Sequence, residues 1–366
     1  MMNIDPFTPG LLTRLPAPPR KVVLLRASRI GDFICATPAL RALRKALPQA
    51  EITMITLPML RDLALRSPYL DNFVAFPGFP GIAEQFFRAS DTTRFLQAMQ
   101  AEGYDLAIQM QGTGIYSNPF MLLLGARTTA GFVRPGDTPG LLDAALPYPQ
   151  HTHEIRCVLA LSSFLGAKAL DETIEFPLWP QDHQEAEACL KDVEAPLIGL
   201  HLAARELTRR WDPERFVEVG KALRRRYGGT ILLLGEAEEQ AAMESVAGKI
   251  GSPCLNLTGH TSLVTLGAII ARLAILITND TGPAHIAYAL NTPTVTIFGA
   301  GNPATNGPLQ RGPFRVLAHP VPCRPCGYHA CPIGYTCLNN ITVAQVVEQA
   351  EEIIQLSTRR NLSSSA

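Results

Sequence analysis

The turn Asn279-Asp280-Thr281-Gly282 is the stretch whose residue types most directly suggest chemistry. Residues 274–277 before it are a short apolar run, which is typical of a strand buried on both faces. Pro283 after it suits the first turn of a helix, because proline lacks only an N–H that the helix does not need there. Free N–H groups at a helix start favour an anion, typically phosphate. The alternative is a plain strand-to-helix turn in which Asp280 or Thr281 acts as the helix cap.

A second polar turn follows the first apolar run of the chain. Residues 21–26 are predicted to form a buried strand, and Gly31 and Asp32 follow it at the carboxyl end. The next helix begins either at Asp32, with Pro38 kinking it, or at Thr37, with Pro38 as its first residue. Ligands bind at this edge of open parallel sheets, so the Asp32 carboxylate is a candidate site residue. Its alternative role is that of a helix cap, and the two roles do not exclude each other.

The elements that must position these turns alternate along the whole chain. Strands are predicted over 21–26, 51–56, 71–76, 104–109, 197–202, 230–234, 254–257, 274–277 and 294–298. Helical segments separate most of them, and this alternation is typical of doubly wound parallel sheets. A chain of 366 residues exceeds one usual core, so two α/β domains are expected. The predicted parts are a flexible leader (1–20), a first domain (21–170), a linker (171–196), a second domain (197–342), a C-terminal helix (343–357) and a disordered tail (358–366).

Composition limits the classes of function. The chain is 47% hydrophobic and 17% charged, which provides material for sizeable cores and argues against disorder. Its net charge of zero argues against nucleic acid as a partner. No apolar run is long enough to span a membrane, and the proline-rich start lacks the apolar core of a signal peptide. We therefore expect a cytoplasmic protein whose cysteines are reduced thiols or metal ligands.

Three turns at strand ends of the second domain should share one edge of its sheet. They span residues 201–211, 235–239 and 279–285. Arginine side chains, an acidic side chain near Glu238 and a helix start would then face one ligand, and this set suits the phosphates and ribose of a nucleotide diphosphate. The sequence has neither a Walker motif nor a GxGxxG motif. Alternatively, Arg209 and Arg210 are solvated residues, and Glu238 only supports a first helical turn.

The order of several segments resembles the ADP-heptose:lipopolysaccharide heptosyltransferases of glycosyltransferase family 9. The matching segments are LLRASRIGDFICATPALRALRKALPQAEIT, ARELTRRWDPERF, LLLGEAEEQ, LTGHTSLVTLGAIIARL and ITNDTGPAHIAYALNTPTVTIFG. They extend from about residue 21 to residue 342. The resemblance implies a GT-B fold, with two facing Rossmann-like domains, parallel sheets and a cleft between them.

The resemblance also implies roles for individual residues. Asp32 would be the catalytic base, Arg209 or Arg210 the cation for the donor phosphate, Glu238 a ribose contact, Asp280 a contact to the donor sugar, and Thr281-Gly282 the phosphate cradle. Arg205 and His285 complete the expected donor side, and Ser28 and Gly31 the acceptor side. The implied reaction moves a heptose from a nucleotide sugar, most simply ADP-heptose, to a lipopolysaccharide core or related glycan, with inversion and no catalytic cofactor or metal.

The implied acceptor lies at the inner face of the inner membrane, so peripheral membrane contact is expected. A Gly/Pro/Phe-rich loop over 77–90 could cover a site or touch lipid. Two other functions remain open: another nucleotide-sugar enzyme of the same fold, such as an epimerase, and a non-catalytic nucleotide-sugar-binding protein. Nucleotide sugars tested with and without an acceptor lipid would separate these functions.

Four cysteines lie close together near the end of the second domain. They are Cys323, Cys326, Cys331 and Cys337, within a Pro/Gly-rich stretch. Reduced cysteines at this spacing could hold a structural zinc ion, and an unligated loop is the alternative.

Overall fold

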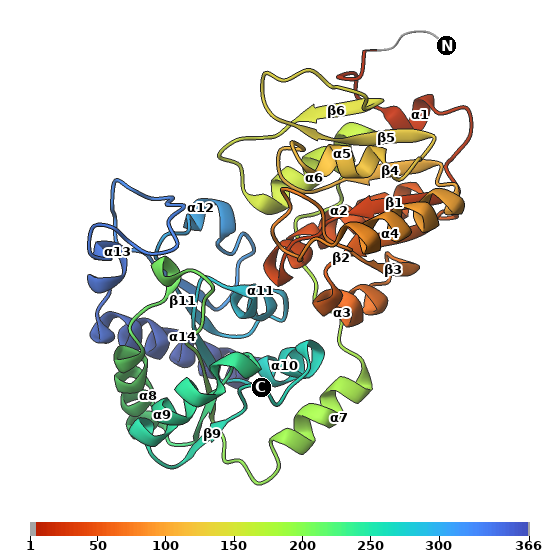
Figure 1. Ribbon diagram of the computed structural model, residues 1–366. Helices are drawn as coiled ribbons and strands as arrows, with labels where there is room; N and C mark the ends of the chain where they lie inside the picture. Colours follow the sequence, from red (N-terminus) through yellow and green to blue (C-terminus); the bar gives the residue numbers. More distant parts are fainter. Residues whose placement is uncertain (1–4, 365–366) are drawn as a thin grey trace. The chain divides into compact units, whose positions relative to one another are not determined.

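The computed structural model describes residues 5–364, which divide between Pro177 and Leu178 into two compact units (Figure 1). The division falls inside the segment 171–196 that was expected to be a linker. Each unit contains one six-stranded sheet whose strands are all parallel. The predicted α/β class with two parallel sheets is confirmed.

The first sheet has the strand order β3-β2-β1-β4-β5-β6. Its strands are β1 (Lys21–Leu25), β2 (Glu51–Thr56), β3 (Asn72–Ala75), β4 (Leu106–Gln109), β5 (Thr128–Val133) and β6 (Ala144–Pro147). Its helices are α1 (Leu11–Arg14), α2 (Ile30–Ala46), η1 (Pro58–Leu60), α3 (Arg61–Arg66), α4 (Ala89–Glu102), α5 (Ser117–Leu122) and α6 (Glu154–Leu165). The strand order reverses between β1 and β4, and in open parallel sheets ligands bind outside the carboxyl ends of the strands at such a point.

Helix α2 begins at Ile30, two residues before the earlier of the two predicted starts. Pro38 therefore lies inside the helix, where it cannot donate to the carbonyl of Ile34. The hydroxyl of Thr37 donates to that carbonyl instead, at 2.7 Å. The helix thus continues past its proline to Ala46.

Residues 5–20 of the predicted flexible leader make contacts with the rest of the first unit, and residues 1–4 lie outside the described residues. The Ala145 N–H of the edge strand β6 donates to the Pro6 carbonyl at 2.9 Å, and the Gly10 N–H donates to the Phe164 carbonyl at 2.7 Å. Leu11 is buried in the short helix α1. The open edge of β6 explains the order of this segment, because an unpaired strand edge offers hydrogen-bonding groups to any neighbouring chain.

The second sheet has the strand order β12-β11-β10-β7-β8-β9, which is the same winding as in the first. Its strands are β7 (Leu197–His201), β8 (Thr230–Leu233), β9 (Cys254–Asn256), β10 (Ile275–Asn279), β11 (Thr294–Ile297) and β12 (Phe314–Leu317). Its helices are α7 (Pro180–Cys189), η2 (Leu207–Arg209), α8 (Pro213–Tyr227), η3 (Ala237–Glu239), α9 (Gln240–Ile250), α10 (Leu263–Ile270), α11 (Gly282–Ala289), α12 (Pro303–Asn306), α13 (Thr336–Asn339) and α14 (Val343–Ser364). Here the order reverses between β7 and β10.

The main core of the second unit lies between one face of its sheet and the helices α8, α9 and α14. Val346, Ala350 and Ile353 of α14 are fully buried there. The helix continues through residue 364, so residues 358–364 are helical rather than disordered. No glycine or proline occurs after residue 343 to end the helix. Residues 365–366 of the predicted tail lie outside the described residues.

Several short elements were not predicted, namely α5, β5, β6, α12, β12 and α13. Two of the missed strands, β6 and β12, are the edge strands of their sheets and have four residues each. Strands of this length carry little periodic signal.

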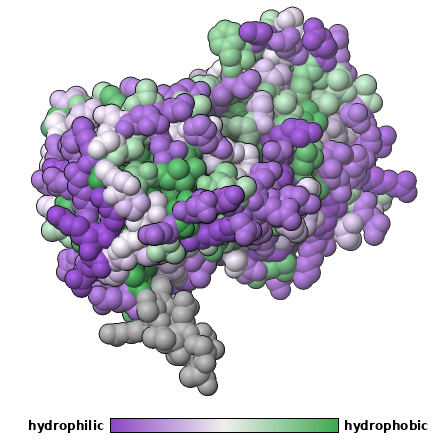
Figure 2. Space-filling view, turned by 90° about the horizontal axis from the view of Figure 1, so that it is seen from below, coloured by the Kyte–Doolittle hydropathy of each residue, from purple (hydrophilic) through white to green (hydrophobic). Residues whose placement is uncertain are grey.

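Hydrophilic residues, in purple, cover most of the face shown in Figure 2, and hydrophobic residues, in green, lie in separate small areas. Within residues 5–364, no helix is both long and apolar enough to cross a membrane.

Candidate active site

The carboxyl end of β1 carries a buried arginine. Arg26 is 2% exposed, and its guanidinium contacts three different segments. It donates to the Asp32 carbonyl at 2.8 Å, to the Met110 carbonyl after β4, and to the Glu154 carboxylate at 2.7 Å. The reversal of strand order lies between β1 and β4, where a ligand is expected to bind. Arg26 therefore joins three segments of the chain at this place.

Asp32 lies at the third position of α2. It is therefore not the cap residue that the alternative interpretation expected, because Arg29 occupies the cap position. Its Oδ2 accepts the Arg29 N–H at 3.2 Å, while its Oδ1 is 3.9 Å from the Arg26 guanidinium. The side chain is 44% exposed. The protein around the carboxyl nevertheless removes enough water to raise the pKa of Asp32 above its usual value, although Arg26 opposes this rise. A raised pKa brings a carboxylate closer to the range in which it acts as a general base.

Glu154, the first residue of α6, is the closer partner of Arg26. Burial would raise the pKa of Glu154, but the charge of Arg26 and its hydrogen bond outweigh burial, and the pKa is lowered. The Tyr148 hydroxyl donates to the same carboxylate at 3.2 Å. Two carboxylates next to one arginine therefore differ in proton affinity, which is the usual sign of a separation of roles.

The predicted acceptor-side residues lie beside Asp32. Gly31 is half-buried in the first turn of α2. The Ser28 hydroxyl is buried and has no hydrogen-bond partner among the described residues, and the same holds for the Gln111 Oε1. The Gln111 amide donates to the Ala27 carbonyl at 3.1 Å, so both unpaired oxygens belong to loops at the same sheet edge. Buried polar atoms without a partner are uncommon and suit a place where a ligand supplies one.

The corresponding place in the second sheet is built on Asn279, the last residue of β10. Its side chain is fully buried, accepts the Trp211 N–H at 3.1 Å and donates to the Leu202 carbonyl at 2.7 Å. It therefore fixes both ends of the loop that follows β7. That loop contains the arginines expected on the donor side.

Of the two candidate arginines, Arg209 reaches Asp280. Its Nη1 lies 3.1 Å from the Asp280 Oδ2, and its side chain is 35% exposed while that of Asp280 is 3% exposed. Arg210 instead donates to the Ala204 carbonyl within its own loop. The geometry thus favours Arg209 as the phosphate cation. The burial of Asp280 also favours a role in orienting the Arg209 side chain, rather than a direct contact to the donor sugar.

The start of α11 lies next to this pair. Thr281 occupies the cap position without capping the helix, and its hydroxyl lies 3.3 Å from the His201 Nδ1. Pro283 has no N–H, and the Ala284 N–H bonds the Thr281 carbonyl at 3.1 Å. The Gly282 N–H has no partner among the described residues and can donate to an anion, as the phosphate prediction requires.

His201 supports the turn as a neutral ring. It is 6% exposed, and burial lowers its pKa to about 4. The ring also lies 3.2 Å from the Thr278 hydroxyl, so His201 at the end of β7 bridges two threonines, Thr278 within β10 and Thr281 just after it. A neutral histidine adds no charge to the site near pH 7.

The remaining predicted donor residues differ in placement. Arg205 and Glu238 are exposed in loops at the carboxyl ends of β7 and β8. His285 is buried in α11, with its ring 5.8 Å from that of Tyr288. It therefore packs in the interior, and the geometry gives its predicted donor contact no support.

The cysteine loop contacts the donor loop. The Thr208 hydroxyl donates to the Tyr328 carbonyl at 2.7 Å, and the Thr208 N–H donates to the His329 carbonyl at 3.3 Å. Within residues 5–364, no three His, Cys, Asp or Glu side chains are gathered so that they could hold a metal ion. The zinc site at Cys323, Cys326, Cys331 and Cys337 therefore stays a prediction, which metal analysis of the purified protein would test.

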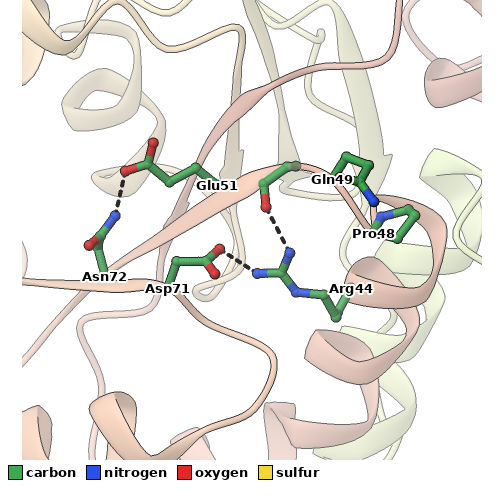
Figure 3. A pocket seen from close by; sticks show the side chains of 7 residues that line it. Arg44, Pro48, Gln49, Glu51, Asp71 and Asn72 are labelled. Carbon is green, nitrogen blue, oxygen red and sulfur yellow. Dashed lines mark hydrogen bonds and ion pairs between the residues drawn. The ribbon is translucent and has the colours of Figure 1, made fainter.

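A polar hollow of about 420 Å³ lies away from both of these places (Figure 3). It opens beside the first residues of β2 and β3, at the amino end of the first sheet. Arg44 pairs with Asp71 at 2.5 Å, and the Asn72 amide donates to Glu51 at 2.6 Å (Figure 3). The charged and amide side chains of Arg44, Asp71, Asn72 and Glu51 are thus engaged with one another.

The chain is similar to known proteins in both sequence and fold. The sequence profile of glycosyltransferase family 9 (heptosyltransferase) matches residues 92–335. The chain belongs to glycosyltransferase family 9. The family 9 chain is 26% identical to lipopolysaccharide heptosyltransferase 2 of Salmonella typhimurium over 358 residues, which cover 91% of this chain and 98% of that protein.

Two solved structures show that the fold of this family 9 enzyme is GT-B. A family 9 glycosyl transferase from Veillonella parvula superposes with a TM-score of 0.76 at 22% identity, covering 92% of this chain and 97% of that one. The ADP-heptose lipopolysaccharide heptosyltransferase II of E. coli superposes with a TM-score of 0.73 at 21% identity, covering 92% and 99%. The predicted family, fold and enzyme class are confirmed.

Sequence reasoning missed three residues that organise the site of this glycosyltransferase. A charged residue directly after the apolar run 21–25 could have marked Arg26. Glu154 gave no such signal, because its contact with Arg26 joins residues 128 positions apart. Asn279 was placed in the correct turn, but its two hydrogen bonds to the β7 loop depend on the packed sheet.

Proposed function

We propose that this glycosyltransferase transfers a heptose from ADP-heptose to a lipopolysaccharide core or related glycan, with inversion at the anomeric carbon. The observation that carries the proposal is the exposed guanidinium of Arg209, anchored on buried Asp280 beside the uncapped start of α11. The printed names of the relatives supply the identity of the donor and acceptor: one is a lipopolysaccharide heptosyltransferase and another an ADP-heptose heptosyltransferase.

The donor diphosphate is held at the carboxyl edge of the second sheet. Arg209 contributes a charged hydrogen bond, and the Gly282 N–H and the positive end of the α11 dipole contribute a second attraction. Both interactions strengthen as the bond to the sugar breaks, because negative charge then builds up on the leaving diphosphate. Exposed Glu238 is the proposed contact for the ribose hydroxyls.

Asp32 is the proposed base for the acceptor. Its carboxylate takes the proton of the acceptor hydroxyl as that oxygen forms a bond to the anomeric carbon. The bond from the anomeric carbon to the phosphate oxygen breaks in the same displacement, and ADP leaves. A single displacement inverts the anomeric configuration, and no side chain becomes covalently attached to the sugar.

We further propose that the acceptor is met at the inner face of the inner membrane. In the loop expected to contact lipid, the side chain of Phe86 is 79% exposed and that of Phe87 is 40% exposed. The rest of the loop packs on the protein: Phe79 stacks edge-on against Phe120 at 5.3 Å, and Glu84 pairs with Arg29 at 2.8 Å. Exposed aromatic side chains on an ordered loop suit contact with an apolar surface.

The reaction can be tested directly with purified protein. ADP-heptose and a truncated lipopolysaccharide core should give ADP and an acceptor heavier by one heptose, whereas other nucleotide sugars should give less product. The new linkage should have the anomeric configuration opposite to that of the donor, as read by NMR. Conversion of the donor without an acceptor would instead indicate an epimerase, and tight binding without turnover would indicate a non-catalytic binding protein.

A further inference from the structure

Arg26, Glu154 and Tyr148 form a buried network next to Asp32. We propose that Glu154 is a positioning residue of the transfer reaction: by accepting the hydrogen bond of the Arg26 Nη2, it keeps the Asp32 carboxylate out of a close ion pair with Arg26 and able to accept a proton. The proposal rests on the proposed role of Asp32 as the base. It concerns residues that contact neither the donor nor the acceptor in the mechanism above.

The guanidinium of Arg26 is fixed on several sides. Its Nε donates to the Asp32 backbone carbonyl at 2.8 Å, its Nη1 to the Met110 carbonyl, and its Nη2 to Glu154 at 2.7 Å. The first of these bonds fixes the backbone of Asp32. The planar fork of arginine allows this set of contacts, which a lysine could not reproduce.

Nη2 is the atom for which the two carboxylates compete. It lies 2.7 Å from the Glu154 Oε1 and 3.9 Å from the Asp32 Oδ1. Glu154 therefore has the hydrogen bond, and Asp32 has only the weaker attraction across the longer distance. If Glu154 were neutral, the Arg26 guanidinium would have no other charged partner at Nη2, and its attraction to the Asp32 carboxylate would be stronger.

Glu154 is itself held in place. The Tyr148 hydroxyl donates to its Oε2 at 3.2 Å, and the Tyr148 ring stacks edge-on against Phe132 at 5.1 Å. His153 caps α6 by accepting the Ile155 N–H at 3.2 Å, which fixes the backbone on the other side of Glu154. The carboxylate thus has little freedom to leave Arg26 and approach Asp32.

The charged groups around Asp32 act in opposite directions on its proton affinity. Burial and the negative charges of Glu154 and Glu84 raise the pKa of Asp32, while Arg26 and the Arg29 N–H lower it. The titratable groups that face Arg26 and Glu154 are Asp32, Cys35, Tyr148, His153 and Cys157. Removing the charge of Glu154 takes away one raising contribution and frees the main lowering one. Both changes lower the pKa of Asp32.

Glu154→Gln is the variant that tests the network. The acid limb of its kcat/KM profile should move down by roughly one pH unit, because this limb reports the base of the free enzyme. Its kcat on the pH plateau should fall about tenfold, since a weaker base that is partly paired with Arg26 takes up the proton less readily. The KM for ADP-heptose should not change, because the donor contacts lie in the second unit.

Two further variants separate positioning from general damage. Glu172→Gln removes a carboxylate from an exposed pair with Arg156 and should leave the profile unchanged. Glu154→Asp retains the charge and should restore the acid limb toward its wild-type position. If Glu154→Gln does not fold, Tyr148→Phe provides a milder test, with a smaller shift expected in the same direction. An unshifted acid limb in a folded Glu154→Gln protein would overturn the proposal.

A readout without turnover keeps this test distinct from that of the reaction itself. The carboxyl carbon of Asp32 can be followed by NMR in protein labelled with ¹³C-aspartate and assigned with Asp32→Asn. Its titration midpoint should move down in Glu154→Gln and stay in place in Glu172→Gln. If the midpoint moves but Asp32→Asn retains full turnover, the network is real and Asp32 is not the base. If the midpoint does not move, the network proposal fails whatever the activity.

Discussion

The two sheets carry an arginine–carboxylate pair at the same topological position, with opposite partners facing solvent. In the first pair Arg26 is 2% exposed and Asp32 is 44% exposed. In the second, Asp280 is 3% exposed and Arg209 is 35% exposed. Both pairs lie where the strand order reverses, so the winding of the sheet does not determine which partner is exposed.

The exposed partner indicates the chemistry of each place. A buried cation beneath an exposed carboxylate leaves an oxygen that can accept a proton. A buried carboxylate beneath an exposed guanidinium leaves N–H donors that can bind a phosphate. In each pair the buried member holds the other in position and offsets part of its desolvation. Substituting the exposed member of one pair at a time tests whether the two pairs have these different roles.

The largest effect is expected from Asp32→Asn. Losing the proton acceptor should reduce kcat roughly 10²–10⁴-fold, while the donor KM stays within about twofold of wild type. Steady-state kinetics with ADP-heptose and a truncated core would measure both values.

Asp32→Ala provides the control for structure. Asparagine can still accept the Arg29 N–H, whereas alanine cannot, so the alanine variant alone should lose about 1 kcal/mol of unfolding free energy. If Asp32→Asn and wild type have equal turnover, Asp32 is not the base, and its only role is the hydrogen bond to the Arg29 N–H at the start of α2.

The second largest effect is expected from Arg209→Ala. Loss of one charged hydrogen bond to the diphosphate should weaken ADP binding by roughly 1.5–3 kcal/mol in titration calorimetry. Arg210→Ala is the matched control, because Arg210 bonds the Ala204 carbonyl, and it should change ADP affinity much less. If Arg210→Ala weakens ADP binding more than Arg209→Ala does, the assignment of the phosphate cation is reversed.

A smaller effect is expected from Gly301→Ala. A methyl group at Gly301 would lie 2.0 Å from the Asp280 Oδ2, so the carboxylate must move and Arg209 with it. We expect ADP affinity to fall by up to about tenfold in a folded protein, since a displaced ion pair retains part of its interaction. Gly248→Ala adds the same methyl in α9, where nothing lies within 4 Å, and should leave affinity unchanged. Equal ADP affinity in both variants would show that the exact place of Asp280 does not matter.

The smallest effect on function is expected from substitution of His201. The substitution should instead change how the stability of the folded protein depends on acidic pH. The pKa of His201 is about 4 in the folded protein, below the ordinary value of 6.5. Between these two pH values, the unfolded chain binds a proton at His201 that the folded protein does not bind. This contribution to stability is complete above pH 6.5, is lost as pH falls toward 4, and amounts to at most about 3 kcal/mol. Urea unfolding of His201→Gln should therefore show a flatter decline over that range than wild type. Identical slopes would mean that His201 titrates normally in the folded protein.

The sequence predicted the elements that flank these pairs because they have strong local signals. The strands β1, β7 and β10 are apolar runs with a polar turn behind each, and parallel strands bring such turns to one edge. The helix starts were less certain, because the interior Pro38 depends on the Thr37 hydroxyl to satisfy a carbonyl, and this is visible only in the folded helix.

The exposure of each partner could not be predicted from sequence. Whether Arg26 or Asp32 faces solvent depends on Glu154, which joins the site from a helix far along the chain. Whether Arg209 or Arg210 reaches Asp280 depends on the direction of a loop fixed by Asn279 and Trp211. Local sequence patterns contain neither of these long-range contacts.

The helix α14 also determines when, during synthesis, the second unit can close. Its buried residues Val346 and Ile353 complete a core whose other members begin at Ile198. Ribosomes add roughly 5–20 residues per second, and domains tend to fold from the N-terminal one onward. The first unit, which ends at Pro177, can therefore form Asp32 and its network while the second still lacks its last helix. A nascent chain arrested before residue 343 would hold the proposed base in place without a finished second unit.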